Sequence, residues 1–269
     1  MTHKLIFLDI DGTLLSGGID GTIPESAAES LLAARENGHL LFINTGRSLS
    51  YLPAQVMHFP FDGYICGCGT EIVLYGEEIF HYQLSPETRF SIKDILGQCR
   101  IQGVLEGRKH LYYNTSETMI PPVEAVYRAS LQRSNDLVRT FDDPKLDYDK
   151  FSAFADENSN LSLFRELLPG ELEILREEKR GLSCRFLEIV PRQCSKASGI
   201  DYVTNYLGKS LDDCYVFGDG ANDLPMLKHV KNSIAMGNSS REIFKEVSYV
   251  TTPVNRKGIM IAMKHFGLI

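Results

Sequence analysis

The sequence has no hydrophobic run of membrane-spanning length and no recognisable export signal. A transmembrane helix needs about 20 consecutive apolar residues, whereas the apolar run near the N-terminus is short and is interrupted by Asp9 and Asp11. The same interruption argues against a signal peptide. We therefore expect a cytoplasmic protein that has no membrane partner.

The sequence also lacks an excess of positive charge. It has 28 Lys and Arg against 35 Asp and Glu, which gives a formal net charge of -7 over 269 residues. Such a chain has no general electrostatic attraction to nucleic acid or to an anionic membrane. An anionic substrate would have to be attracted by a local site. The length and a hydrophobic content of 43% are ordinary for one large or two medium globular domains.

No set of histidines or cysteines has the spacing of a zinc site. The six cysteines would permit disulfides in a small secreted domain, but this chain is neither small nor visibly exported. We therefore expect reduced thiols. Cys66 and Cys68 form the one closely spaced pair, and packing at a strand end is favoured there over a metal or redox role.

Both ends of the chain alternate short apolar runs with amphipathic segments, which predicts an α/β fold with a parallel sheet. The predicted strands are 5–8, 40–43, 63–66, 215–217, 233–236 and 249–251. One helix is predicted between the start signal at Thr22 and the stop at Gly38, and two more at 222–230 and 259–265. A further helix is predicted to begin with a capping box of Ser239 and Glu242.

The middle of the chain differs, because its runs are longer, more polar and partly alternating. Half-exposed strands are predicted at 110–114 and 151–155, an alternating segment at 184–189, and helices at 123–132 and from 158–160 to 169–170. We therefore predict a discontinuous core domain, 1–82 and 185–269, with an inserted α+β domain, 83–184, that has its own antiparallel sheet.

Four polar segments lie at or just beyond the ends of predicted core strands, where the binding crevice of an open parallel sheet forms. In the first, Asp9 and Asp11 directly follow a buried strand, and Gly12 permits a turn. Two carboxylates there are costly unless they are used or paired; a capped turn is the alternative. In the second, Thr45 and Gly46 offer a hydroxyl and backbone N–H groups to an anion, although a plain turn explains them equally well.

The third segment is Lys196, which follows a predicted strand at 186–190. A lysine at a helix N-terminus opposes the helix dipole, which suggests a bound anion; a solvated lysine is the alternative. The fourth is the turn from Asp219 to Asp223, which has too many oxygen ligands for a merely structural turn. Together the segments supply hard oxygen ligands for Mg²⁺ from Asp9, Asp11 and Asp219 and phosphate donors from Thr45 and Lys196.

In this order the motifs DIDGT, NTGR, Lys196 and GDGAND resemble those of the haloacid dehalogenase-like (HAD) superfamily. The position and size of the insertion resemble the Cof-like phosphatase branch, which implies a Rossmann-like core and an inserted cap. By resemblance, Asp9 is the nucleophile and Asp11 the general acid and base. The resemblance further implies Mg²⁺ held by Asp9, Asp219 and the backbone carbonyl of Asp11, with Asp223 acting through water, and a phosphoryl group bound by Thr45, Gly46, Lys196 and Asn222.

The sequence departs from relatives at Cys68, where they commonly have Asn, and this affects specificity more than catalysis. The function expected is a Mg²⁺-dependent phosphatase that hydrolyses small phosphorylated metabolites, such as sugar phosphates, through an aspartyl-phosphate. The alternatives are a phosphomutase of the same superfamily and a phosphometabolite sensor without turnover. The sequence names neither the substrate nor the oligomeric state.

Overall fold

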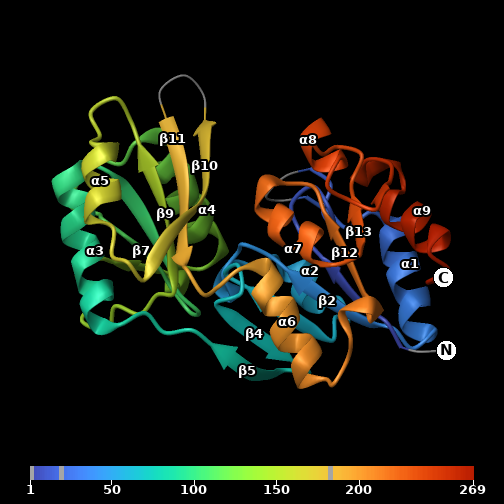
Figure 1. Ribbon diagram of the computed structural model, residues 1–269. Helices are drawn as coiled ribbons and strands as arrows, with labels where there is room; N and C mark the ends of the chain where they lie inside the picture. The colour runs from blue at the N-terminus through green and yellow to red at the C-terminus, as the bar shows by residue number, and fades with distance from the viewer. Residues whose placement is uncertain (1–2, 18–20, 181–183) are drawn as a thin grey trace. The chain divides into compact units, whose positions relative to one another are not determined.

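The structure is a computed structural model that describes residues 3–17, 21–180 and 184–269 (Figure 1). The chain forms two compact units, each with its own sheet. The first unit comprises Met1–Gly46, Leu52–Phe80 and Ser195–Ile269, and the second comprises Arg47–Tyr51 and His81–Cys194. The fold is thus α/β, as the sequence predicts.

The first unit is built on an eight-stranded sheet in the order β14-β13-β12-β1-β2-β3-β4-β5. Strands β14 to β3 in this order are parallel, and β4 runs antiparallel to β3. The strands are β1 (Leu5–Leu8), β2 (Leu40–Asn44), β3 (Gly63–Cys66), β4 (Glu71–Leu74), β5 (Glu77–His81), β12 (Cys214–Gly218), β13 (Asn232–Ala235) and β14 (Tyr249–Val250). The central strand β1 is buried along its whole length, because helices cover both faces of the sheet.

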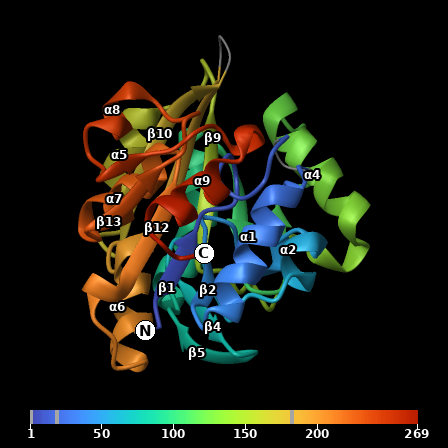
Figure 2. The ribbon, with the colours of Figure 1, turned by 90° about the vertical axis from the view of Figure 1, so that its right-hand side faces the viewer.

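Helices α1 (Glu25–Glu36) and α9 (Gly258–His265) pack together on one face of this sheet (Figures 1 and 2). The other face packs against α6 (Lys196–Tyr206), α7 (Leu224–His229) and α8 (Arg241–Phe244) in one hydrophobic cluster. The unit also contains the short α2 (Ala54–His58). Helix α1 buries Ala27, Leu31 and Ala34, the apolar face that the sequence predicts.

The predicted elements of the first unit lie close to their expected positions, with two differences of detail, whereas β4, β5 and α2 were not predicted. The predicted helix at 222–230 begins as a 3₁₀ turn at Ala221–Asp223 and continues as α7. The predicted capping box of Ser239 and Glu242 is wrong, because α8 begins after Ser240, whose side chain makes no capping hydrogen bond.

The second unit has a six-stranded sheet in the order β10-β11-β9-β6-β7-β8. The strands are β6 (Gln102–Glu106), β7 (Leu111–Tyr113), β8 (Val138–Thr140), β9 (Lys150–Ala155), β10 (Leu172–Arg180) and β11 (Cys184–Pro191). The sheet is mixed and not purely antiparallel as predicted, because β7 and β8 pair in parallel. The chain therefore crosses over between them, and it does so through α4 (Pro121–Arg133).

Helices cover both faces of this second sheet. Helices α3 (Pro86–Cys99) and α5 (Leu161–Leu167) share one hydrophobic cluster with residues of β9 and β11, and α4 shares another with β6 and β7. The prediction of half-exposed strands is consequently wrong, because every residue of β7 and β9 is buried.

Strand β11 corrects one further expectation. The segment 186–190 was predicted as a core strand that leads to Lys196, but it belongs to β11, which pairs with β10 and β9 in the second sheet. The expected cap, 83–184, lies within the second unit, which runs from His81 to Cys194 and also includes Arg47–Tyr51. The domain boundaries themselves stay a prediction.

Within the described residues, no helix combines the length and the apolar character that a membrane span requires. The six cysteines are all buried thiols. Cys66 ends β3 and Cys68 follows it, and both side chains are fully enclosed. Neither belongs to a group of possible metal ligands among the described residues.

Candidate active site

The carboxyl ends of three neighbouring strands bring the predicted site residues together. Strand β1 lies between β12 and β2, and all three run in parallel. Asp9 directly follows β1, Asp219 follows β12, and Thr45 follows β2. Segments more than 200 residues apart in sequence therefore meet at one edge of the sheet.

The turn after β1 requires glycine. The N–H of Asp9 still donates to the carbonyl of Phe217 at 3.0 Å, which continues the pairing with β12. Gly12 then has a φ of +83°, and a Cβ there would lie 2.2 Å from Oδ2 of Asp219. A larger residue would therefore be strained and would also displace the Asp219 carboxylate.

Lys196 is fixed at the first turn of α6. Ser195 caps this helix: its side chain accepts the N–H of Ser198 at 3.0 Å, and the Ser198 hydroxyl closes the capping box at 2.9 Å. The Lys196 side chain is 1% exposed. Its Nζ donates to Oδ1 of Asp9 at 2.5 Å and to Oδ1 of Asp223 at 2.6 Å. The alternative of a solvated lysine is therefore wrong.

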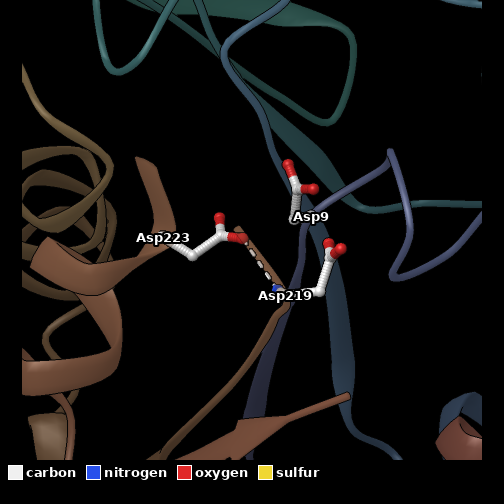
Figure 3. Close-up of side chains that lie close together, drawn as sticks. All are labelled: Asp9, Asp219 and Asp223. Atoms are coloured by element: carbon white, nitrogen blue, oxygen red, sulfur yellow. Dashed lines mark hydrogen bonds between the residues drawn. The ribbon is translucent and has the colours of Figure 1, made fainter. Parts of the chain in front are cut away.

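Asp223 also shapes the turn that carries it. Its Oδ2 accepts the backbone N–H groups of Asp219 and Gly220, both at 2.9 Å. Figure 3 shows the contact between the Asp223 carboxylate and the N–H of Asp219. The Asp223 carboxylate thus stabilises the 3₁₀ turn at the end of β12 with one oxygen and accepts a hydrogen bond from Lys196 with the other.

Asp9, Asp219 and Asp223 form a compact group of carboxylates (Figure 3). One oxygen of each lies within 4.8 Å of the others. Asp9 and Asp223 are buried and Asp219 is half-buried. Asp11 is not in this group; it is exposed at the start of the following loop.

Among the described residues, the ammonium group of Lys196 contacts two of these three carboxylates, Asp9 and Asp223. Burial, together with the charge of Asp223, raises the pKa of Asp9 to about 8 and that of Asp219 to about 6. Burial lowers the pKa of Lys196, but the facing carboxylates of Asp223 and Asp9 outweigh it and raise that pKa overall. A bound cation would also compensate the negative charge of these carboxylates.

The residues present fit a magnesium ion. The donor set consists of carboxylate oxygens, which Mg²⁺ prefers, and includes no histidine or cysteine. The negative charge of the group and the raised carboxylate pKa values are what a divalent cation would compensate.

The predicted phosphate-binding residues follow the same core strands, apart from Lys196 at the start of α6. Thr45 is buried after β2, but its backbone N–H is not available to an anion, because it donates to the carbonyl of Ile65 at 2.9 Å. The chain after Gly46 continues into a short 3₁₀ turn at Leu49–Tyr51. Asn222 is half-buried in the turn after β12. The phosphate-binding roles of Thr45, Gly46, Lys196 and Asn222 stay predictions.

Three polar residues in the site received no role from the sequence, although Thr13 and Asn44 stand in the motifs DIDGT and NTGR. Thr13 donates its hydroxyl to Oδ1 of Asp219 at 3.0 Å, and Asn238 donates to Oδ2 of Asp219 at 3.1 Å. Asn44, the last residue of β2, donates to the carbonyl of Lys196 at 2.9 Å. The motifs could have identified Thr13 and Asn44, whereas Asn238 follows β13 without any motif around it.

The chain is similar to proteins of a known hydrolase family. A family model described as haloacid dehalogenase-like hydrolase matches residues 6–263. The curated protein "Putative phosphatase YkrA" of Bacillus subtilis (strain 168) is 29% identical over 281 residues, which cover 100% of both chains. An "HMP-PP phosphatase" of Escherichia fergusonii is 25% identical, and the match covers 92% of this chain and 89% of that protein.

Solved structures agree with this family. The structure of the HAD subclass IIB sugar phosphatase BT4131 has a TM-score of 0.81 and 27% identity, and the match covers 99% of this chain and 100% of that one. A hypothetical protein from Geobacillus kaustophilus has a TM-score of 0.83 and 26% identity over 100% of both chains. The parallel core sheet and the second, mixed sheet are thus those of subclass IIB. The chain therefore belongs to the haloacid dehalogenase-like hydrolases and is a phosphatase of the Cof-like subclass IIB, a phosphoric monoester hydrolase.

Proposed function

We propose that this phosphatase is Mg²⁺-dependent and hydrolyses small phosphorylated metabolites, sugar phosphates in particular, through an aspartyl-phosphate on Asp9. The observation that carries the proposal is the bridge from Lys196 to Asp9 and Asp223, beside Asp219. This arrangement supports the proposal, because a buried carboxylate that could act as nucleophile lies beside a buried ammonium group and two further carboxylates. Phosphoryl transfer needs such positioning and charge stabilisation more than it needs further chemistry.

In the first step, a carboxylate oxygen of Asp9 attacks phosphorus and the bond to the leaving alcohol oxygen breaks. Asp11 gives a proton to that oxygen. The exposure of Asp11 in the turn after β1 supports this role, because the leaving group must stay accessible. The carboxylate of Asp9 is steadied for the attack by its hydrogen bond from Lys196.

In the second step, water attacks the phosphorus of the aspartyl-phosphate, Asp11 accepts a proton from that water, and Asp9 leaves as a carboxylate. Covalent catalysis of this kind divides one slow hydrolysis into two easier steps. Lys196, Thr45, Gly46 and Asn222 would bind the phosphoryl oxygens.

The carboxylates of Asp9 and Asp219 and the backbone carbonyl of Asp11 would hold Mg²⁺, and Asp223 would act through water. The ion would supply positive charge to the phosphoryl oxygens. The raised pKa values of Asp9 and Asp219 support this, since both groups are ionised more readily beside a cation.

The substrate class rests on the relatives. BT4131 is described as a sugar phosphatase, and other relatives are named phosphatases, one of them for HMP-PP. These names support a small phosphorylated metabolite as the partner of this chain. The buried thiols support a reducing, cytoplasmic setting.

The proposal is tested by phosphate release from a panel of sugar phosphates, nucleotides and cofactor phosphates, with Mg²⁺ and with EDTA. We expect phosphate release with Mg²⁺ and none with EDTA. In Asp9→Asn the rate of release should fall by about 10³-fold or more. Asp212→Asn is the matched control, because Asp212 is exposed at the opposite, amino end of β12.

Mass spectrometry of acid-quenched enzyme should find one phosphoryl group on the peptide that contains Asp9, and none in Asp9→Asn. Full activity in EDTA would refute the metal role. Isomerised sugar phosphate without phosphate release would identify a mutase. Binding of a phosphorylated metabolite with neither phosphate release nor isomerisation would identify a sensor without turnover.

A further inference from the structure

We propose that Asn238 is a positioning residue that fixes the Asp219 carboxylate and the loop after β1 for binding of a divalent cation. The inference rests on the proposed Mg²⁺-dependent function and deepens it. Asn238 lies just beyond β13, outside every motif that the sequence identified.

One amide group connects three segments of the first unit. Nδ2 of Asn238 donates to the carbonyl of Gly12 at 2.9 Å and to Oδ2 of Asp219 at 3.1 Å. Its Oδ1 accepts the N–H of Val254 at 3.0 Å. The loops after β1 and β12 are therefore both tied to the loop after β13, which is itself tied to the turn that precedes α9.

The hydrogen bonds allow only one orientation of this amide. Gly12 and Asp219 present oxygen acceptors, and Val254 presents an N–H donor. The NH₂ group of Asn238 must face the two acceptors, and its oxygen must face the donor, because the flipped amide would oppose like partners at all three contacts. The site thus specifies an amide, and neither an aspartate nor an aliphatic residue reproduces the set.

Asp219 receives a protein donor on each of its oxygens. Thr13 donates to Oδ1 and Asn238 to Oδ2. With a donor on both sides, rotation of the carboxylate about its terminal bond would break a hydrogen bond, so its plane is fixed. Residues that orient metal ligands in this way typically change metal affinity by about 10- to 100-fold when they are removed.

The contact with Gly12 adds a second effect. Gly12 follows Asp11, whose backbone carbonyl is a proposed ligand, and a Cβ at Gly12 would lie only 2.2 Å from Oδ2 of Asp219. The two ligand-bearing loops are thus in close contact, and Asn238 bonds to both of them where they meet. Removing it would release the spacing of the loops as well as the orientation of Asp219.

The test uses the full chain and Mn²⁺ alone, whose binding is followed by the loss of the free-ion signal in electron paramagnetic resonance. We expect Asn238→Ala to weaken Mn²⁺ binding by about 10-fold, the lower end of the range, because Asn238 is exposed. Activity of Asn238→Ala should return close to the wild-type value at saturating Mg²⁺, while half-maximal activity shifts to higher Mg²⁺. A general structural defect would lower the maximum and leave the half-point unchanged.

Two further variants sharpen the test. Asn238→Asp keeps the acceptor for Val254 but loses both donated hydrogen bonds, so it should also weaken Mn²⁺ binding although it adds a negative charge. Asn37→Ala is the matched control. It removes one amide hydrogen bond, to the carbonyl of Leu268, at the end of α1, where the chain enters the amino end of β2. It should bind Mn²⁺ as wild type does.

The outcomes separate the two proposals. If wild type binds Mn²⁺, Asp219→Asn loses it and Asn238→Ala binds as tightly as wild type, the role of Asn238 is refuted and the metal site stands. Equal or tighter binding by Asn238→Asp would likewise refute positioning by hydrogen-bond donation. If wild type itself binds no Mn²⁺, the metal-dependent function fails and the inference fails with it.

Discussion

Replacing Lys196 with methionine removes a positive charge that lies between Asp9 and Asp223. Methionine matches the unbranched stem and fills most of the space, so the change is chiefly electrostatic. The lysine is 1% exposed and donates to both carboxylates, at 2.5 and 2.6 Å. Removal of one partner from a buried ion pair costs about 3–5 kcal/mol, because the remaining charge is left uncompensated. We expect a loss of this size in the free energy of unfolding of the metal-free protein at pH 8.

The loss should depend on pH in a defined direction. The pKa of Asp9 is already raised to about 8 by burial and by Asp223, and loss of Lys196 raises it further. A carboxylate whose pKa is higher in the folded than in the unfolded state costs no stability below the unfolded pKa; the cost grows as pH rises from the unfolded to the folded pKa and is constant above it. Each tenfold decrease in the acid dissociation constant of Asp9 in the folded protein adds about 1.4 kcal/mol to this cost at high pH. The deficit of Lys196→Met should therefore be larger at pH 8 than at pH 5.

The measurement is urea unfolding in EDTA at both pH values, for wild type, Lys196→Met and the double variant Lys196→Met/Asp9→Asn. The double variant has one buried carboxylate fewer and should recover about 1 kcal/mol or more of the deficit at pH 8. A deficit of the same size at both pH values, or none at all, would show that Lys196 does not compensate these carboxylates.

Two further predictions concern stability away from the site. Tyr75 and Gly76 form the two-residue turn between β4 and β5, with φ values of 52° and 85°. Since Asn tolerates this conformation better than Tyr, Tyr75→Asn should raise the free energy of unfolding, measured by thermal unfolding, by about 0.5–1 kcal/mol. An equal gain in Tyr75→Ala would rule out the turn as the cause. Glu171 accepts hydrogen bonds from Tyr82, Ser85 and Thr88 at the start of α3, and these hydrogen bonds outweigh burial and lower the pKa of Glu171. Glu171→Gln should lower the free energy of unfolding by about 1 kcal/mol after allowance for solvent screening, and this cost should disappear as pH falls through the lowered pKa. A pH-independent difference in urea unfolding would contradict the prediction.

The core sheet could be predicted from the sequence because its strands are buried on both faces. Such strands are short continuous apolar runs, as in β1 and β2, and they are easily distinguished from the amphipathic α1. The same reasoning failed in β9, whose alternation suggested one exposed face. Lys150 and Ser152 lie on that face and are buried, because they bond to Glu188 at 2.7 Å and to Glu106 at 2.6 Å. These partners lie on other strands, and local sequence does not reveal them.

The site divides in a similar way. Asp9, Lys196, Asp219 and Asp223 stand in motifs with several polar residues close together, and the structure brings these four residues into one group. Asn238 has no such context, since a single asparagine after a strand resembles any turn residue. Its partners Gly12 and Val254 lie 226 and 16 residues away, so its three hydrogen bonds exist only in the folded chain.

The pairing of β1 with β12 has a consequence for synthesis of the chain on the ribosome. Leu5 pairs with Cys214, so the central strand of the core waits for a partner that is made 209 residues later. At about 5–20 residues per second, that wait lasts roughly 10–40 s. Every described strand of the second sheet lies between β6 and β11 in the chain, so these strands emerge before β12. Meanwhile β1 presents an apolar, unpaired edge on the nascent chain, of the kind that other strands can pair with, and the N-terminal strands are consequently where protection by a chaperone would matter most.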